Sequence, residues 1–193
     1  MARIVVIENV SLDGVAQAPG RPDEDTRGGF GHGGWAGPYA DGTAMAKMGE
    51  GMARTTAMLF GRRTYEDFFG YWPKQTDGNP FTPVLDNATK HVASRTLEEP
   101  LPWRNSVLLA GEAADTAAVL KEELDGDVVV LGSLELVRSL AAAGLVDEYL
   151  LLIHPILLGT GKRLFPEGGP SGGLRLVDST TSTTGVIIAT YRP

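Results

Sequence analysis

The stretch LFGRRTYEDF, residues 59–68, places two arginines directly after a glycine, where an apolar run gives way to a helical pattern. Glycine lets the backbone turn tightly and lets a ligand approach closely. Thr64 followed by Asp67 indicates a helix start, whose first N–H groups have no partner inside the helix. Arginines beside free N–H groups favour an anion, most often phosphate. The alternative is a solvated turn whose arginines pair with Glu66 and Asp67.

Apolar runs alternate with helical patterns on both sides of this stretch. Strands are predicted for residues 3–10, 56–61, 90–97, 105–111, 127–133 and 146–159, and for a closing pair around Gly185. Helices are predicted for residues 42–54, 115–126 and 133–144, with Asp115 and Ser133 as N-caps. Residues 71–83 are expected to form a loop. Such alternation implies a mostly parallel sheet covered on both faces, and the closing pair predicts an antiparallel edge.

The composition limits the classes of function. The net charge of −7 and the pI near 4.9 argue against broad binding to nucleic acid or to an anionic membrane. The chain has no cysteine, which excludes disulfides and the zinc–cysteine site of nucleobase deaminases, and its three histidines are too scattered for a metal site. With no repeat, linker, signal peptide or membrane span evident, we expect one cytoplasmic domain over residues 1–193.

Three predicted strands end in residues that suit phosphate. One ends in GRRT, the next offers Ser94 and Arg95, and a third ends in Gly132 and Ser133 at a helix start. Ligands of open α/β sheets bind beyond the carboxyl ends of the strands, so we expect a nucleotide there. Two ends that carry arginine indicate an extra phosphate, as on the 2′ position of NADP. The G-x-G-x-x-G fingerprint is absent from all three strand ends, and the chain has no P-loop motif.

Several blocks together resemble a known family. In order they are SLDG, LFGRRTYEDF, KHVASRTL, LGSLELVRSL, GLVDEYLLLIHPILLGTGKRLF and GVIIATYRP. They are similar to the dihydrofolate reductase-like family, in the branch of the riboflavin-biosynthesis reductase domain and its small stand-alone relatives. The resemblance covers nearly the whole chain. It implies a three-layer α/β/α fold with a central mixed sheet of roughly eight strands, NADPH as hydride donor, and a homodimer.

The resemblance also implies roles for individual residues. The phosphates of NADPH would meet Gly61, Arg62, Arg63 and Thr64. The adenosine end and its 2′-phosphate would meet Ser94 and Arg95. The diphosphate and nicotinamide would be lined by Gly132, Ser133, Leu134, Glu135 and Leu136. The segment from Asn9 through Val15 would cover the nicotinamide and the substrate edge.

The predicted substrate side departs from dihydrofolate reductases. Their pterin-binding carboxylate falls near Met45 here, and the nearest acid before it is Asp41, one helical turn earlier. This argues against classical dihydrofolate reduction. Trp35 and Tyr39, in a glycine-rich segment that replaces the usual substrate loop, either stack on a flat heterocycle or pack that segment onto the domain. Asp13 either orients the substrate or a proton-relaying water, or forms an Asp-Gly turn.

Other features lead to further expectations. Residues 20–40 are predicted to act as a mobile lid. Met45, Met48 and Met52 recur at helical spacing, which indicates a stripe facing the core. His154, in an apolar strand, is typical of a core histidine whose hydrogen bonds are satisfied.

Two hypotheses about function remain at this point. The first is an NADPH-dependent reductase that acts on a small nitrogen heterocycle, pterin- or pyrimidine-like. The second is an NADP(H)-binding protein without turnover, serving as a redox sensor or assembly partner. For assembly, the chain from about residue 146 to the hairpin around Gly185 is expected to pack against a two-fold mate.

Overall fold

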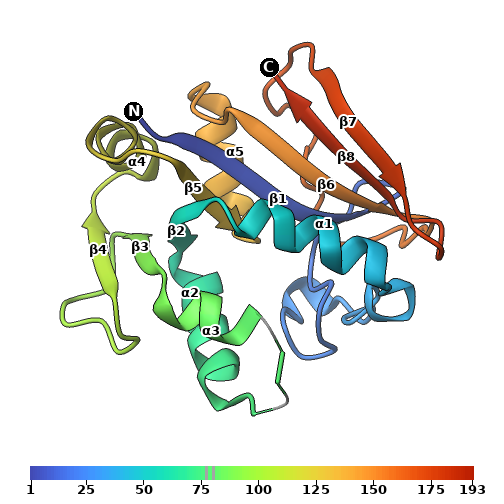
Figure 1. Ribbon diagram of the computed structural model, residues 1–193, viewed down its shortest axis with the longest axis horizontal. Helices are drawn as coiled ribbons and strands as arrows, with labels where there is room; N and C mark the ends of the chain where they lie inside the picture. The colour runs from blue at the N-terminus through green and yellow to red at the C-terminus, as the bar shows by residue number, and fades with distance from the viewer. Residues whose placement is uncertain (77, 80) are drawn as a thin grey trace.

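The computed structural model describes residues 1–76, 78–79 and 81–193 (Figure 1). The strands are β1 (Arg3–Ser11), β2 (Thr55–Gly61), β3 (Thr89–Ser94), β4 (Ser106–Ala110), β5 (Asp127–Leu131), β6 (Glu148–His154), β7 (Arg175–Thr181) and β8 (Ile187–Arg192). The α-helices are α1 (Gly42–Met52), α2 (Arg62–Tyr71), α3 (Phe81–Asn87), α4 (Ala113–Glu123) and α5 (Leu134–Ala142). Short 3-10 turns are η1 (Arg27–Gly29), η2 (Gly37–Tyr39) and η3 (Trp72–Lys74).

The described strands form one eight-stranded sheet in the order β4-β3-β2-β5-β1-β6-β8-β7. The pairs from β4 to β6 are parallel, whereas β8 runs antiparallel to β6 and β7 antiparallel to β8. The mostly parallel sheet with an antiparallel C-terminal edge is therefore confirmed. Strand β1 is apolar over Ile4–Ile7 because both of its faces are covered, as is usual for a central parallel strand.

Helices cover the sheet on both faces and make three layers (Figure 1). On one face α1, α2 and α3 bury Met52, Tyr65 and Leu85. On the other face α4 and α5 bury Leu120 and Leu140. Alternate residues of the strands supply each core, as the two-residue period requires. The α/β/α architecture expected from the family resemblance is confirmed.

Two predicted helix starts were wrong by two or three residues. Helix α2 begins at Arg62 with Gly61 as N-cap, so Thr64 lies inside the first turn. The glycine backbone is extended there (φ −79°, ψ 154°) and leads straight into the helix without a side-chain cap. Helix α4 begins at Ala113 after Glu112. Asp115 therefore lies in the first turn, where a carboxylate interacts favourably with the helix dipole.

Two other boundaries also differ from the prediction. Strand β6 ends at His154 rather than continuing to residue 159, because Pro155 has no N–H for the ladder. The predicted loop over residues 71–83 contains η3 and the start of α3. Residues 77 and 80 of that loop lie outside the described part of the chain.

Residues 18–40 carry a small apolar core of their own. Phe30 and Trp35 are buried against Val15, Ala18 and Leu158, and these contacts hold the segment against the domain.

In α1 the predicted stripe of core-facing methionines is only partly confirmed. Met52 is in the core and Met48 packs against it, but Met45 is 48% exposed. No helix in the described residues is long and apolar enough to cross a membrane.

Candidate functional site

Helices α2 and α5 start side by side at the carboxyl edge of the sheet. The N–H of Gly61 donates to Ser133 Oγ at 3.0 Å, which ties the start of α2 to the N-cap of α5. Gly132 and Ser133 both have positive φ, at 60° and 62°. A Cβ on Gly132 would stand 3.4 Å from the methyl of Thr64, so a larger residue would be both strained and crowded. Ser133 is the N-cap as predicted, but its hydroxyl binds Gly61 instead of capping its own helix.

The three predicted phosphate-binding arginines lie around this point with weak existing partners. Arg62 pairs with Glu66 at 3.2 Å on the surface of α2, and Arg95 pairs with Glu112 at 3.0 Å. Arg63 is exposed and forms no ion pair with a described residue. Surface ion pairs contribute roughly 0–1 kcal/mol, so these guanidiniums can exchange their partners for a phosphate at little cost. The alternative of arginines paired with nearby acids holds for Arg62.

The remaining predicted cofactor residues act through backbone and turn geometry. Ser94 is buried, and its Oγ accepts the N–H groups of Thr96 and Leu97, which turns the chain after β3 and leaves Arg95 73% exposed. In α5, Leu134 and Leu136 pack on the core, whereas Glu135 is exposed and pairs with Arg138. The side chains of Leu134 and Leu136 are therefore structural. At the start of α5, the backbone is what faces the carboxyl edge of the sheet.

A charged segment crosses the same edge. In this segment, residues 20–27 and hereafter the strap, Arg21 pairs with Asp67 of α2 at 2.5 Å and lies 4.2 Å above the ring of Tyr71. At the other end Asp25 pairs with Lys162 at 3.0 Å, in the loop that follows β6. Because β5 and β1 lie between β2 and β6, the strap passes over the carboxyl ends of β5 and β1. Its charged residues are visible in the sequence, but the partners of these residues are not.

Glu8 is a buried acid beneath this region. It follows the last residue pair between β1 and β5, which places it beside Gly132 at the start of α5. Glu8 is 2% exposed, and its Oε1 has no hydrogen-bond partner among the described residues. Burial, with the nearby Glu24 carboxylate, raises the pKa of Glu8 well above its usual range. Sequence reasoning missed this residue, since one acid in an apolar strand gives no periodic signal.

Asp13 holds a turn in place. Its Oδ1 accepts from Ser11 Oγ at 2.6 Å and from the N–H of Leu158 at 3.1 Å, and its Oδ2 accepts from the N–H of Gly159 at 2.7 Å. The Ser11 hydroxyl, followed by these backbone donors, lowers the pKa of Asp13 to about 2. An acid that stays ionised at neutral pH is a poor proton donor. The geometry therefore favours the Asp-Gly turn over proton transfer.

Three of the predicted substrate residues meet at His154. Asn9 Oδ1 lies 2.9 Å from His154 Nε2. The rings of Trp35 and Tyr39 meet the imidazole edge to face, with centroids 5.2 and 5.6 Å away. His154 itself was expected to be a core residue, because an all-apolar strand does not show which face each side chain takes.

Asp41 lies apart from this cluster. It is the N-cap of α1, where Oδ1 accepts from the N–H of Ala44 at 2.8 Å. Its Oδ2 accepts from both the N–H and the hydroxyl of Thr183 at 2.7 Å, in the turn between β7 and β8. Both oxygens are thus engaged in fixing α1 to the C-terminal hairpin.

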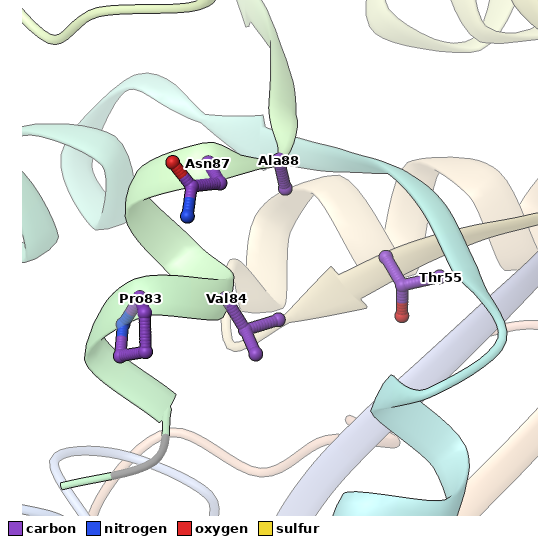
Figure 2. Close-up of a pocket in the computed structure, with 5 residues that line it drawn as sticks. All are labelled: Thr55, Pro83, Val84, Asn87 and Ala88. Atoms are coloured by element: carbon purple, nitrogen blue, oxygen red, sulfur yellow. The ribbon is translucent and has the colours of Figure 1, made fainter.

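Figure 2 shows a pocket of about 380 Å³ at the opposite edge of the sheet. It is lined by Thr55, Pro83, Val84, Asn87 and Ala88. Thr55 begins β2 and Ala88 precedes β3, so the pocket lies at the amino ends of these strands and away from the converging helix starts. It therefore plays no part in the candidate site. Across the described residues, no group of histidine and acidic side chains could hold a metal ion.

Comparison with known proteins identifies relatives of this chain and supports its fold. The chain is 28% identical over 137 residues to the uncharacterized protein YyaP of Bacillus subtilis (strain 168), which covers 69% of this chain and 72% of that protein. A crystal structure from Shewanella sp. PV-4, provisionally named a riboflavin biosynthesis protein, superposes with a TM-score of 0.68 and 21% identity over 100% of this chain and 98% of that one.

Dihydrofolate reductase from Enterococcus faecalis, solved with NADP(H), superposes with a TM-score of 0.59 and 13% identity over 98% of this chain and 95% of that one. At these identities the two structures support the dihydrofolate reductase-like fold. The family model described as the RibD C-terminal domain matches residues 2–188. The chain therefore belongs to the RibD C-terminal domain family.

Proposed function

We propose that this protein is an NADPH-dependent reductase that transfers a hydride to a small nitrogen heterocycle of pyrimidine or pterin type. The observation that carries the proposal is the junction of α2 and α5, where Gly61 contacts Ser133 and two helix N-termini open onto one sheet edge lined by arginines. Free N–H groups at helix starts and guanidiniums are donors that a dinucleotide diphosphate requires. Membership of the RibD C-terminal domain family supports the same assignment.

The residues present fit NADPH. The starts of α2 and α5 would hold its diphosphate, with Arg62 and Arg63 beside it, and Arg95 at the end of β3 would meet the 2′-phosphate. Thr64 would contribute from the first turn of α2, as the family resemblance suggests. The strap lies across the same edge, so its contacts with Asp67 and Tyr71 must adjust for the cofactor to enter.

The substrate would bind on the α1 side of the end of β1. Asn9, Trp35 and Tyr39 supply an amide and two flat rings there, which suits a planar heterocycle. NADPH supplies the hydride when bound, and the chain contributes position and exclusion of water. Since Asp13 is ionised and Met45 stands where related reductases carry an acid, the accompanying proton is expected to come from water.

The test is a binding and turnover experiment. NADPH binding is measured by titration calorimetry, and NADPH oxidation is followed against a panel of pterins, uracil-type flavin precursors and quinones. Oxidation with a pterin or uracil supports the reductase. Binding without turnover across the panel supports the cofactor-binding protein instead, and failure to bind NADPH refutes both. Replacing Arg62 and Arg95 together by alanine should weaken NADPH binding, and Arg175→Ala is the matched control, because Arg175 is an exposed arginine on β7 at the far side of the sheet.

We also propose that the protein is a homodimer, but the interface that we propose differs from the one expected from the sequence. Strand β6 is buried within the monomer between β1 and β8, so it needs no partner chain. The edge strand β7 is exposed along most of its length, and Leu176, Val177 and Ile187 leave apolar surface at this edge. A two-fold contact can cover such a patch on both copies at once.

A further inference from the structure

His154 is the last residue of β6 and pairs with Ser11 of β1, so it stands at the edge where the proposed substrate binds. Asn9 pairs with Leu152, two residues before His154, and the two side chains share one face of the sheet. His154 is 4% exposed. It is therefore a buried imidazole at the end of β6, beside the proposed substrate position.

Within the described part of the chain, one nitrogen of this imidazole has a hydrogen-bond partner. Asn9 presents Oδ1 to His154 Nε2 at 2.9 Å, and in the tautomer that satisfies this acceptor the ring proton is on Nε2 and a lone pair is left on Nδ1. Nδ1 is buried and has no hydrogen-bond partner among the described residues. Burial also lowers the pKa of His154 to about 4, so the ring is neutral at physiological pH. The site thus holds an uncharged acceptor that lacks a donor.

An orphan acceptor of this kind costs roughly 1–3 kcal/mol in a folded protein. A ligand N–H that reaches it recovers that cost, whereas a ligand without a donor leaves it in place. Discrimination by such a site is strong because the wrong ligand leaves a buried polar atom unpaired. The rings of Trp35 and Tyr39, at 88° and 72° to the imidazole, pack beside His154 and add apolar surface next to it.

We infer that His154 is a specificity-determining residue whose Nδ1 accepts a hydrogen bond from a ring N–H of an uncharged heterocycle, as a uracil ring provides. This rests on the proposed function and narrows its substrate class. Asn9 is a positioning residue, because its amide holds the imidazole in the tautomer with Nδ1 free. A ring whose nitrogens carry methyl groups offers no donor and is rejected.

The test compares 5,6-diaminouracil with 5,6-diamino-1,3-dimethyluracil by titration calorimetry at saturating NADP⁺. The wild type is expected to bind the N–H form at least about tenfold more tightly, which corresponds to about 1.4 kcal/mol. His154→Gln keeps an amide near the Nε2 position but has no polar atom at Nδ1, so its affinities for the two uracils should differ by no more than about twofold. His154→Asn keeps a polar atom near Nδ1 and should retain a ratio of about fivefold.

His91→Gln is the matched control, since His91 on β3 is also buried with an unpartnered Nδ1 but stands away from Asn9. It should leave the ratio unchanged, and NADP⁺ affinity should stay within about twofold in every variant. A wild-type ratio near one, no binding of either uracil, or an unchanged ratio in His154→Gln would overturn the inference.

Two further measurements distinguish a failure of this inference from a failure of the proposed function on which it rests. If the wild type does not bind NADP⁺, the cofactor proposal fails, and the two uracils are then compared without nucleotide so that the role of Nδ1 is still decided. If a variant fails to fold, nitrogen NMR of the wild-type histidines decides instead. The inference is supported if His154 has an unprotonated Nδ1 and a protonated Nε2, and if the Nδ1 signal changes when 5,6-diaminouracil is added. A protonated Nδ1 overturns it.

Discussion

Acidification should destabilise this protein through His154. The pKa of His154 is lowered by burial to about 4, against a usual value of 6.5. Between these two pH values the unfolded chain binds a proton that the folded chain excludes, so stability falls as the pH falls. The loss from this residue is about 2 kcal/mol at pH 5 and about 3 kcal/mol at pH 4, relative to pH 7.5.

The assay is urea denaturation at pH 7.5 and pH 5 for the wild type and His154→Phe. Phenylalanine keeps a ring against Trp35 and Tyr39 but cannot titrate, so the variant should lose about 2 kcal/mol less than the wild type on acidification. Other titrating groups are common to both proteins and cancel in this difference. His32→Ala is the control, because His32 is exposed and should leave the wild-type pH dependence intact. Equal losses in the wild type and His154→Phe would refute the reasoning.

Four other predictions follow from the site and its surroundings. NADPH should bind at least about tenfold more tightly than NADH, and replacing Arg62 and Arg95 together by alanine should remove most of that gap of about 1.4 kcal/mol, as paired calorimetric titrations will show. Backbone amides of residues 20–40 should gain protection from hydrogen exchange at saturating NADPH; unchanged exchange there would argue against a lid. Sedimentation should show a homodimer at micromolar concentration that Leu176→Asp weakens, because Leu176 is 51% exposed on the edge strand β7; a 20.5 kDa wild-type species would count against it. The wild type should lose stability as the pH rises above the usual pKa of a glutamate, because the raised pKa of Glu8 makes its ionised form unfavourable in the folded protein. Glu8→Gln should abolish this loss, and identical pH dependences of urea unfolding in the two proteins would contradict the reasoning.

The geometry of the proposed cofactor side was largely predictable from the sequence because it depends on where strands end. A buried parallel strand is an apolar run, and the glycine or serine after it marks the helix start. Gly61 and Ser133 were identified in this way, and the parallel topology then brings them together. The exact first residue of α2 was not predictable, since a Gly N-cap leaves no side-chain signature and Thr64 supplied a misleading one.

The contacts of the strap could not be predicted from the sequence. Arg21 and Asp67 are 46 residues apart, and a single charged pair across a fold leaves no pattern in either segment. The same holds for Asp25 with Lys162. Glycine content alone suggested a mobile loop over residues 18–40, whereas Phe30 and Trp35 give this segment a buried anchor.

The cluster that we propose as the substrate side was only partly predictable, because His154 at its centre was not identified as part of it. Asn9, Trp35 and Tyr39 were recognised because polar and aromatic residues stand out from their neighbours. His154 was hidden by its strand, since β6 is apolar on both faces and alternation cannot assign a side to any residue in it. The register with β1 supplies that assignment, because pairing Ser11 with His154 places the imidazole diagonally beside Asn9. A shift of one residue in this register would turn His154 to the opposite face and leave Asn9 without its partner. The chemistry of the substrate side therefore depends on a strand pairing between residues 143 positions apart, a relation that no local pattern in the sequence contains.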